Sequence, residues 1–415
     1  MRRIVEAFAP ARLGGAFRWL LATSWVSNLA DGVALAAGPL LVASLTEDAR
    51  LIALAATVQW VPPLVFGLLA GALSDRLDRR RIILVANVAR VLVLAVLVAV
   101  MWTDRVSIGV VLGVLFLLAT AEVFADNTAS TLLPMLVARR DLAVANSRLQ
   151  AGFITVNQLA GPPIGAALFA AGVVWPFVTQ AVLLALAAVL VARIALPPHG
   201  LATPGRSHLR RDIVEGVRWT ARHPAVRTLA ITIFTFNITY GAAWSVLVLY
   251  ATRRLGLGEV GFGLVTTVSA MGGLLGTLAY GRITRHVSLA DLMRIGLIIE
   301  TLTHLALALT STAWVAMVVF FVFGVHAFVW GTTSITIRQR AVPTELQGRV
   351  GSVYMVGVFG GTTIGSVIGG VIAEHWGVTA PFWFEFVGSA LLVVGIWREL
   401  RHIAHDDAPT PPAEL

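Results

Sequence analysis

Hydrophobic residues in this chain gather into twelve long windows, which short polar or glycine-containing segments separate. A helix that crosses about 30 Å of hydrocarbon at about 1.5 Å per residue needs about 20 apolar residues. Each window has at least this length, so the pattern predicts twelve membrane-spanning helices. The expected spans are 19–44, 51–73, 82–102, 106–128, 149–171, 173–195, 228–250, 260–281, 290–310, 313–335, 351–373 and 378–397.

The composition agrees with this pattern. Of the 415 residues, 57% are hydrophobic and 13% are charged, whereas soluble domains have about 25% charged residues. A soluble core could not bury so much apolar surface, so we expect an all-α integral membrane protein. The chain has no cysteine, which excludes disulfides, a thiolate nucleophile and cysteine metal sites.

Charge predicts the orientation. If the N-terminus is cytoplasmic, 26 of the 31 basic residues, all arginine, fall in cytoplasmic segments, four fall outside, and Arg90 falls within the third window. The positive-inside rule then predicts that both termini are cytoplasmic and that the protein crosses the inner (plasma) membrane. The first apolar run is longer than the h-region of a signal peptide and contains an acid, so we interpret it as the first span.

The longest polar interruption, 196–227, divides the chain into two halves. Its first part is rich in proline and glycine, and its second part, from Leu209 onward, has apolar residues near helical spacing with arginines between them. This pattern predicts an amphipathic helix at the membrane surface, where basic residues meet anionic lipid, rather than a calmodulin-like or nucleic-acid site. The predicted domains are an N-terminal bundle of six helices (1–195), a cytoplasmic linker (196–227), a C-terminal bundle of six helices (228–400) and a cytoplasmic tail (401–415).

The two halves also resemble each other in sequence. Gly161-Pro-Pro-Ile-Gly165 in the fifth window corresponds to Gly361-Thr-Thr-Ile-Gly365 in the eleventh. The segment Asn28-Leu-Ala-Asp31-Gly32 of the first window corresponds to Asn237-Ile-Thr-Tyr240-Gly241 of the seventh. Two parallel repeats of six helices, with a site near the middle of the membrane, are therefore expected.

Ionisable side chains within the windows are costly in a membrane, so each needs a partner or a purpose. Asp31 lies near the middle of the first window, and Glu122 and Asp126 lie one turn apart in the fourth. Glu300 and His304 form a similar pair in the ninth window. The others are His326, which a packing role would also explain, and Glu374 and Glu385, which are expected near helix ends in contact with water.

A short loop between the second and third windows carries a family resemblance. Its sequence from Gly67 to Arg81 is GLLAGALSDRLDRRR, which resembles the pattern Gly-x-Leu-x-Asp-Arg-x-Gly-Arg-Arg/Lys of the major facilitator superfamily. Asp78 stands where the family pattern has glycine. The segments LLPMLVARRDLAVANSRLQ and RQRAVPTELQGRVGS resemble the branch of macrolide-efflux proteins and enterobactin exporters, within the drug:proton antiporters.

This resemblance implies the major facilitator fold and a role for several positions. In the superfamily, helices 1, 4, 7 and 10 line a central cavity, which favours Asp31, Glu122 and His326 and places Glu300 and His304 outside it. Many proton-coupled exporters of the family carry an arginine in helix 4, and this chain has none there. Glycines in helices 5 and 11 resemble an antiporter signature, although helix packing alone would explain them.

The candidate residues form four groups. The proton-coupling candidates are Glu122, which we favour as the proton carrier, and Asp31. The substrate-cavity candidates are Gln59, Trp60, Asn157, Asn237, Tyr240, Trp244, His326, Trp330 and Tyr354. The expected cytoplasmic gate, in which Asp75 pairs with Arg79, faces Asp126 and caps the helix near Gly351, consists of Gly71, Asp75, Arg76, Arg79 and Asp126. The helix-packing residues are Gly161, Pro162, Gly165, Gly361 and Gly365.

These observations predict a secondary transporter that exports amphipathic small molecules in exchange for protons. Aromatic side chains with a few carboxylates suit cationic or amphipathic ligands. The alternatives are export of a siderophore or another native metabolite, and a membrane sensor or lipid-handling protein without transport activity. No hydrolase, metalloprotease or phosphate-binding motif is present, and Gly256-Leu-Gly258-Glu-Val-Gly261 lacks the preceding strand of a dinucleotide site. We expect no enzyme activity, no cofactor or metal and no nucleic-acid partner. The expected partners are a small-molecule substrate, protons and membrane lipid. The expected oligomeric state is a monomer.

Overall fold

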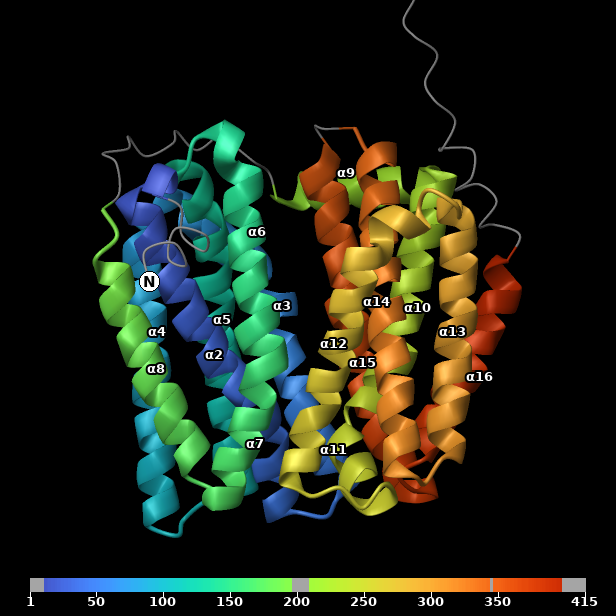
Figure 1. The fold of residues 1–415 in the computed structure, drawn as a ribbon, viewed down its shortest axis with the longest axis horizontal. Coiled ribbons are helices and arrows are strands. Elements are labelled where there is room, and N and C mark those ends of the chain that lie inside the picture. The colour runs from blue at the N-terminus through green and yellow to red at the C-terminus, as the bar shows by residue number, and fades with distance from the viewer. Residues whose placement is uncertain (1–10, 196–208, 344–345, 398–415) are drawn as a thin grey trace, which may run out of the picture. The chain divides into compact units, whose positions relative to one another are not determined.

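The computed structural model describes residues 11–195, 209–343 and 346–397, and in these ranges it contains helices and no strand (Figure 1). The all-α prediction is confirmed for this part of the chain. Ten of its helices are long and apolar enough to cross a membrane, a bent pair can form an eleventh span, and α16 is an apolar helix of 17 residues. The helices of the spans are α2 (Gly14–Leu45), α3 (Ala49–Arg76), α4 (Arg79–Trp102), α5 (Ile108–Leu136), α6 (Leu142–Gly152), α7 (Gly161–Ala171), α8 (Trp175–Ala192), α10 (Pro224–Trp244), α11 (Leu247–Leu249), α12 (Glu259–Ile283), α13 (Leu289–Leu309), α14 (Ala313–Ala341), α15 (Gln347–Trp376) and α16 (Ala380–Ile396).

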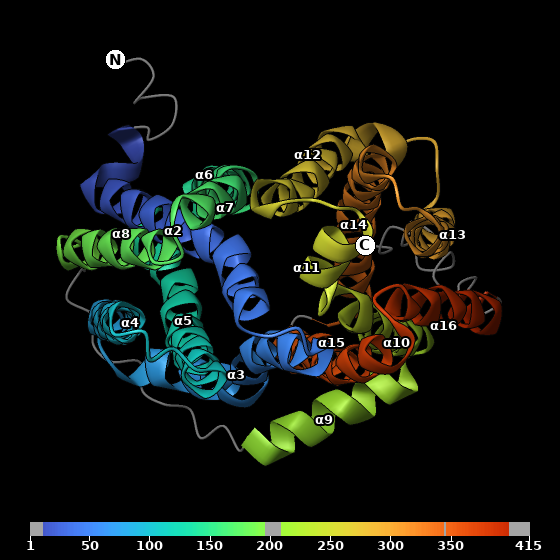
Figure 2. The same cartoon turned by 90° about the horizontal axis from the view of Figure 1, so that it is seen from below.

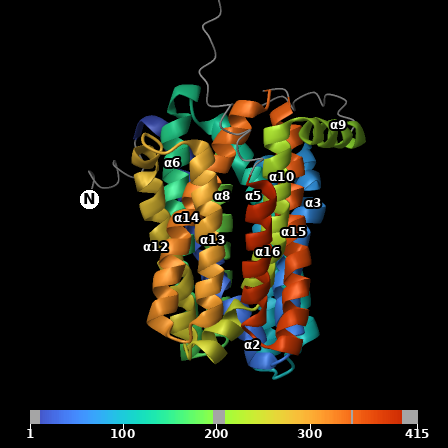
Figure 3. The same ribbon diagram turned by 90° about the vertical axis from the view of Figure 1, so that its right-hand side faces the viewer.

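Two compact units divide the chain. Unit 1 consists of Met1–Arg206 and Gly256–Thr267, and unit 2 consists of Ser207–Leu255 and Val268–Leu415. Within unit 1, α4 lies beside α5 and α8, and α2 packs against α7 and α8 (Figure 2). Within unit 2, α10 packs against α15 and α16, and α13 runs beside α14 and α16 (Figure 3).

The amphipathic segment of the expected linker forms α9 (Leu209–Arg222), which packs within unit 2. Glu215 forms an ion pair with Arg349 of α15, with 2.9 Å between Oε2 and Nη1. Trp219 packs against the buried Val226 and Val350. The apolar side of α9 therefore contacts protein in addition to any lipid, while residues 196–208 lie outside the described part.

Short polar residues fix the starts of several helices. Asp48 caps α3 by accepting a hydrogen bond from the Arg50 backbone N–H at 2.8 Å, and the hydrogen bonds from Arg50 lower the pKa of Asp48. Asp78 caps α4 in the same way, by accepting from Arg81 N–H at 3.2 Å. The acid at the position where the family pattern has glycine thus starts the third span.

Two spans are less regular than the sequence predicts. The fifth begins earlier than residue 149 and includes the π-helix η3 (Phe153–Ala160) between α6 and α7. The seventh bends by 43° after Trp244, and it continues through α11 into the π-helix η4 (Tyr250–Arg254). At the bend, the Ser245 hydroxyl donates to the Ala242 carbonyl at 3.0 Å, and bonds of this kind distort helices.

Glycines bring helix backbones into close contact in both units. An added Cβ on Gly161 of α7 would lie 2.5 Å from Gly32 Cα of α2. In unit 2, an added Cβ on Gly361 of α15 would lie 2.7 Å from the Phe234 carbonyl oxygen of α10. Gly165 and Gly365 have equally close backbone neighbours on the same partner helices. The repeated sequence segments therefore form the same type of helix contact in each unit.

The first prediction concerns this contact. Gly161→Ala should destabilise the protein by about 1–3 kcal/mol, because the new methyl group meets backbone atoms that cannot move aside cheaply. Gly113→Ala in α5 is the matched control, since its added Cβ has no neighbour within 4 Å. Thermal unfolding of both variants in the same detergent measures the difference. Equal melting temperatures for the two variants would show that the α2–α7 contact is not tight.

Candidate functional site

The N-terminal charge cluster consists of Arg90, Asp31, Glu122 and Asp126 in unit 1. Arg90 comes from the middle of α4, Asp31 from the middle of α2, and both other acids from α5. The Arg90 guanidinium donates a hydrogen bond to Asp31 Oδ1, and the same Nη2 lies 3.5 Å from Glu122 Oε2. Asp126, one turn farther along α5, lies within electrostatic range of Asp31 and Arg90. Three helices thus place three carboxylates around one guanidinium.

Burial differs sharply within the N-terminal charge cluster. The Arg90 side chain is 2% exposed and that of Asp31 is 14% exposed, whereas that of Glu122 is 39% exposed. Asp126 is also exposed. The Arg90–Asp31 pair is therefore the most buried part of the cluster, and the side chains of Glu122 and Asp126 on α5 have the larger exposed fractions.

The net charge of the N-terminal charge cluster favours the binding of protons or a cation. An arginine remains protonated in proteins, so the cluster has one permanent positive charge. Its three carboxylates, if all were ionised, would leave an excess of two negative charges. In a region of low dielectric such an excess is costly, and bound protons or a cationic ligand would remove it.

The structure groups the predicted residues differently from the sequence. Asp31 and Glu122 both lie beside Arg90, a residue that was not among the predicted site residues. The family's arginine lies in the fourth span, which is α5 in this structure. Here the guanidinium belongs to the third span, α4, and it reaches Glu122 of α5 from there. The signal was present: a lone arginine in an apolar window needs a carboxylate partner, and three acids were available.

The expected gate is only partly described. The side chains of Asp75 and Arg76 lie outside the described residues, so the pairing of Asp75 with Arg79 stays a prediction. Arg79 Nη1 contacts Met135 Sδ at 2.7 Å, and Met135 lies nine residues beyond Asp126, about 13 Å along α5. Asp126 itself lies in electrostatic range of Arg90, and its expected approach to Asp75 stays a prediction. Gly71 contributes its carbonyl as an acceptor for the Ser74 hydroxyl at 2.7 Å.

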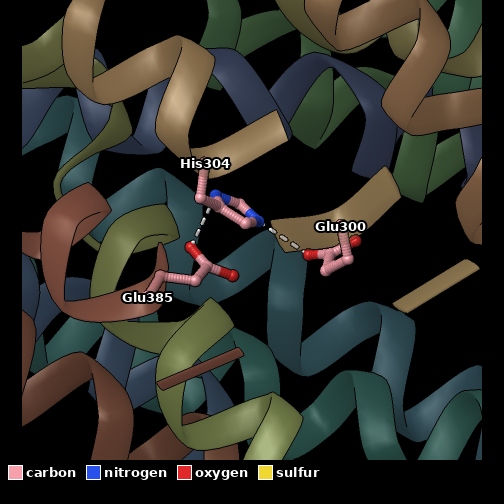
Figure 4. A group of neighbouring side chains, drawn as sticks. All are labelled: Glu300, His304 and Glu385. Carbon is pink, nitrogen blue, oxygen red and sulfur yellow. Dashed lines mark hydrogen bonds and ion pairs between the residues drawn. The ribbon is translucent and has the colours of Figure 1, made fainter. Parts of the chain in front are cut away.

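A second group of ionisable residues, the C-terminal carboxylate–imidazole cluster, lies in unit 2. It consists of Glu300 and His304 of α13, His326 of α14 and Glu385 of α16. His304 lies between the two carboxylates, with Nε2 2.6 Å from Glu300 Oε1 and Nδ1 2.9 Å from Glu385 Oε2 (Figure 4). The second oxygen of Glu300 lies 2.7 Å from His326 Nε2. None of these four residues is more than 7% exposed.

This cluster corrects two expectations. Glu385 was expected in water near a helix end, but its side chain is fully buried because α16 packs it against α13. Glu300 and His304 were set aside because they lie on an outer helix, but they connect His326 to Glu385. The predicted cavity residue His326 directs Nε2 at Glu300.

A metal ion does not fit this cluster as it stands. Glu300, His304 and Glu385 each offer one donor atom within 4.8 Å of the others. However, the two nitrogens of His304 already lie 2.6 and 2.9 Å from carboxylate oxygens, so an ion bound to one nitrogen would have to displace the contact made there. The arrangement instead suits protons, which can occupy each nitrogen–oxygen contact separately.

Three of the predicted cavity residues belong to an aromatic row in unit 2. Tyr240 stacks on Trp244 with 4.6 Å between ring centroids, and Phe236 connects Tyr240 to Trp330. Phe323 packs against Tyr240 and Trp244. Stacked rings of this kind can bind planar or cationic ligands.

The other predicted cavity residues have local partners. Asn237 donates to the Ile233 carbonyl and accepts from the Thr362 hydroxyl at 3.0 Å, so its amide joins α10 to α15. Asn157 donates to the Asn28 carbonyl at 3.2 Å. Tyr354 lies 4.0 Å beneath the Arg338 guanidinium. Gln59 donates to the Ala55 carbonyl at 3.2 Å, and Trp60 is 37% exposed.

Comparisons with known proteins agree with this architecture. Residues 5–410 match the family described as transmembrane secretion effector (MFS_3). The multidrug efflux pump Tap of Mycolicibacterium fortuitum is 30% identical, over 88% of this chain and 90% of that protein. Macrolide efflux protein A of Streptococcus pyogenes is 22% identical over 85% of this chain and 87% of that protein.

Solved structures show the same fold. A mutant of the nucleoside transporter NupG superposes with a TM-score of 0.74 at 12% identity, over 93% of this chain and 100% of that one. A bacterial homologue of the iron transporter ferroportin, in an inward-facing state, gives a TM-score of 0.73 at 16% identity, over 93% and 98%. The predicted major facilitator fold is confirmed. The chain therefore belongs to the transmembrane secretion effector family of the major facilitator superfamily, and it is a multi-span membrane transporter and not an enzyme.

Proposed function

We propose that this transporter exports amphipathic, cationic small molecules in exchange for protons. The observation that carries the proposal is the N-terminal charge cluster, in which three carboxylates surround one buried arginine. Its two less buried carboxylates, Glu122 and Asp126, can be neutralised by protons or by a cation, but not fully by Arg90. Cargo and protons then compete for the same negative charge, which is the requirement for exchange.

Each residue of the cluster has a defined part. Arg90 is a permanent countercharge that fixes Asp31, because the guanidinium is buried and bonded to that carboxylate. Glu122 is the proton carrier, since it lies 3.5 Å from Arg90 and is still partly exposed. Asp126 lies one turn from Glu122 on the same helix, where two ionised carboxylates would repel each other.

The relatives support the direction of transport and the class of cargo. Two proteins that share most of their length with this chain are named multidrug and macrolide efflux proteins. The aromatic row of unit 2 supports cargo with flat apolar surfaces, since Tyr240 and Trp244 offer stacking and cation–π contacts. We further propose that the protein works as a monomer in the plasma membrane, with both termini in the cytoplasm.

The second prediction concerns coupling. Glu122→Gln in proteoliposomes should retain cargo exchange but lose uphill export under an imposed pH gradient, because glutamine cannot carry the proton. Glu259→Gln, which removes an exposed acid at the start of α12, is the matched control and should transport like the wild type. Flux of cationic dyes, macrolides and siderophores measured in the same vesicles would also identify the cargo class. Uphill export that persists in Glu122→Gln would contradict its role as carrier.

The third prediction concerns orientation. A reporter fused after Gly205 should be cytoplasmic, and tags inserted near Asp48 and Asp104 should be external, because the arginine-rich segments are retained inside. Accessibility of the tags to a membrane-impermeant reagent in whole cells is the measurement. An external reporter after Gly205 would reverse the proposed topology.

A further inference from the structure

The C-terminal carboxylate–imidazole cluster differs from the N-terminal charge cluster in the origin of its positive charge. Among the described residues, the cationic groups that contact Glu300 and Glu385 are the imidazoles of His304 and His326. Imidazole is positive only when it binds an extra proton, whereas guanidinium is always positive. Every positive charge in this cluster is therefore a bound proton.

The four side chains form a continuous chain of nitrogen–oxygen contacts across three helices. From α16 to α14, the contacts are Glu385 Oε2 to His304 Nδ1 at 2.9 Å, His304 Nε2 to Glu300 Oε1 at 2.6 Å, and Glu300 Oε2 to His326 Nε2 at 2.7 Å. At these distances two unprotonated atoms would repel each other. Each contact therefore needs one proton.

The three contacts need one proton more than neutral imidazoles and ionised carboxylates supply. A neutral imidazole carries one N–H, so His304 and His326 together supply two protons for three contacts. If both imidazoles point these protons at Glu300, the contact between His304 Nδ1 and Glu385 has none. The third proton must be an additional one, bound either to the ring or to the carboxyl group.

This contact is also the least well-bonded of the three. His304 Nδ1 and both oxygens of Glu385 are buried and make no aligned hydrogen bond within the described protein. The Nδ1–Oε2 separation is nevertheless that of an ion pair. A proton held here has no competing partner, and it joins α13 to α16.

The surroundings leave the proton as the main source of charge compensation. From α10, the titratable group that faces the cluster is the Tyr240 hydroxyl, which lies in electrostatic range of both glutamates. Phe323 of α14 packs edge-on against both imidazoles. The ionic partners Asp291 and Arg294 of α13 lie at the start of that helix and pair with each other at 3.1 Å. No arginine among the described residues pairs with either glutamate of the cluster.

We propose that Glu385 and His304 form a proton-binding site, which holds one exchangeable proton when α16 and α13 are packed as described. Its use as a second coupling site in transport rests on the proposed function, whereas the bound proton itself does not. The site lies wholly within unit 2 and is distinct from the N-terminal charge cluster in unit 1.

Spectroscopy of the purified full-length protein in lipid nanodiscs, washed with EDTA and free of cargo, tests the proposal. At neutral pH, ¹⁵N-histidine NMR should show His304 as imidazolium, or infrared spectroscopy should show the C=O band of a protonated carboxyl group from Glu385. His304→Gln assigns the NMR signal. In Glu385→Gln, the amide can donate to a neutral ring, so either signature should be lost while the fold is kept.

The control variant is Glu259→Gln, in which both spectra should remain as in the wild type. A neutral His304 together with no Glu385-dependent carboxyl band would overturn the proposal. Wild-type spectra that show neither an imidazolium signal nor a protonated-carboxyl band at neutral pH would overturn it without any variant. Stoichiometric Zn²⁺ binding that is lost in Glu385→Gln would also overturn it, in favour of a metal site. Failure of proton-driven export with the bound proton still present would contradict only the proposed function.

Discussion

The buried Arg90 guanidinium is the constraint on which the N-terminal unit depends. A permanent charge within a membrane span is stable only beside carboxylates, so α2 and α5 must present acids at the depth where α4 presents Arg90. The Arg90–Asp31 pair satisfies this requirement at the buried end of the cluster. The two further acids exceed what one arginine can compensate, and this excess is available for protons and cargo.

The two units repeat their helix contacts but not their chemistry. The corresponding glycines Gly161 and Gly361 bring neighbouring backbones equally close, which agrees with the repeat seen in the sequence. The position of Asp31 in the first unit, however, corresponds to Tyr240 in the second. Unit 2 holds its acids on other helices and compensates them with histidine, whose charge depends on proton binding. The same packing thus supports a permanent charge in one unit and a removable charge in the other.

The sequence predicted the fold well and the sites less well, for a physical reason. A membrane-spanning helix needs about 20 consecutive apolar residues, which are easily recognised in a sequence. All twelve expected spans therefore have a helical counterpart in the structure. Which side chains pair between helices depends on the rotation of each helix about its axis and on the depth of each residue in the membrane. The positions of the hydrophobic windows determine neither. Asp31 and Glu122 were recognised as unusual, but their partner Arg90 was not, and Glu385 was assigned to water from its position near a helix end. A search for charge compensation among all intramembrane residues would have connected both clusters.

Proton release on cargo binding tests the account most directly. Binding of a monovalent cationic dye to the purified protein can be followed by calorimetry at one pH in two buffers that differ in ionisation enthalpy. If cargo and protons compete for the N-terminal charge cluster, the measured heat depends on the buffer and reports about one proton released for each dye molecule bound. Binding heats that are identical in the two buffers would show that the cation does not displace a proton, and would contradict the exchange mechanism.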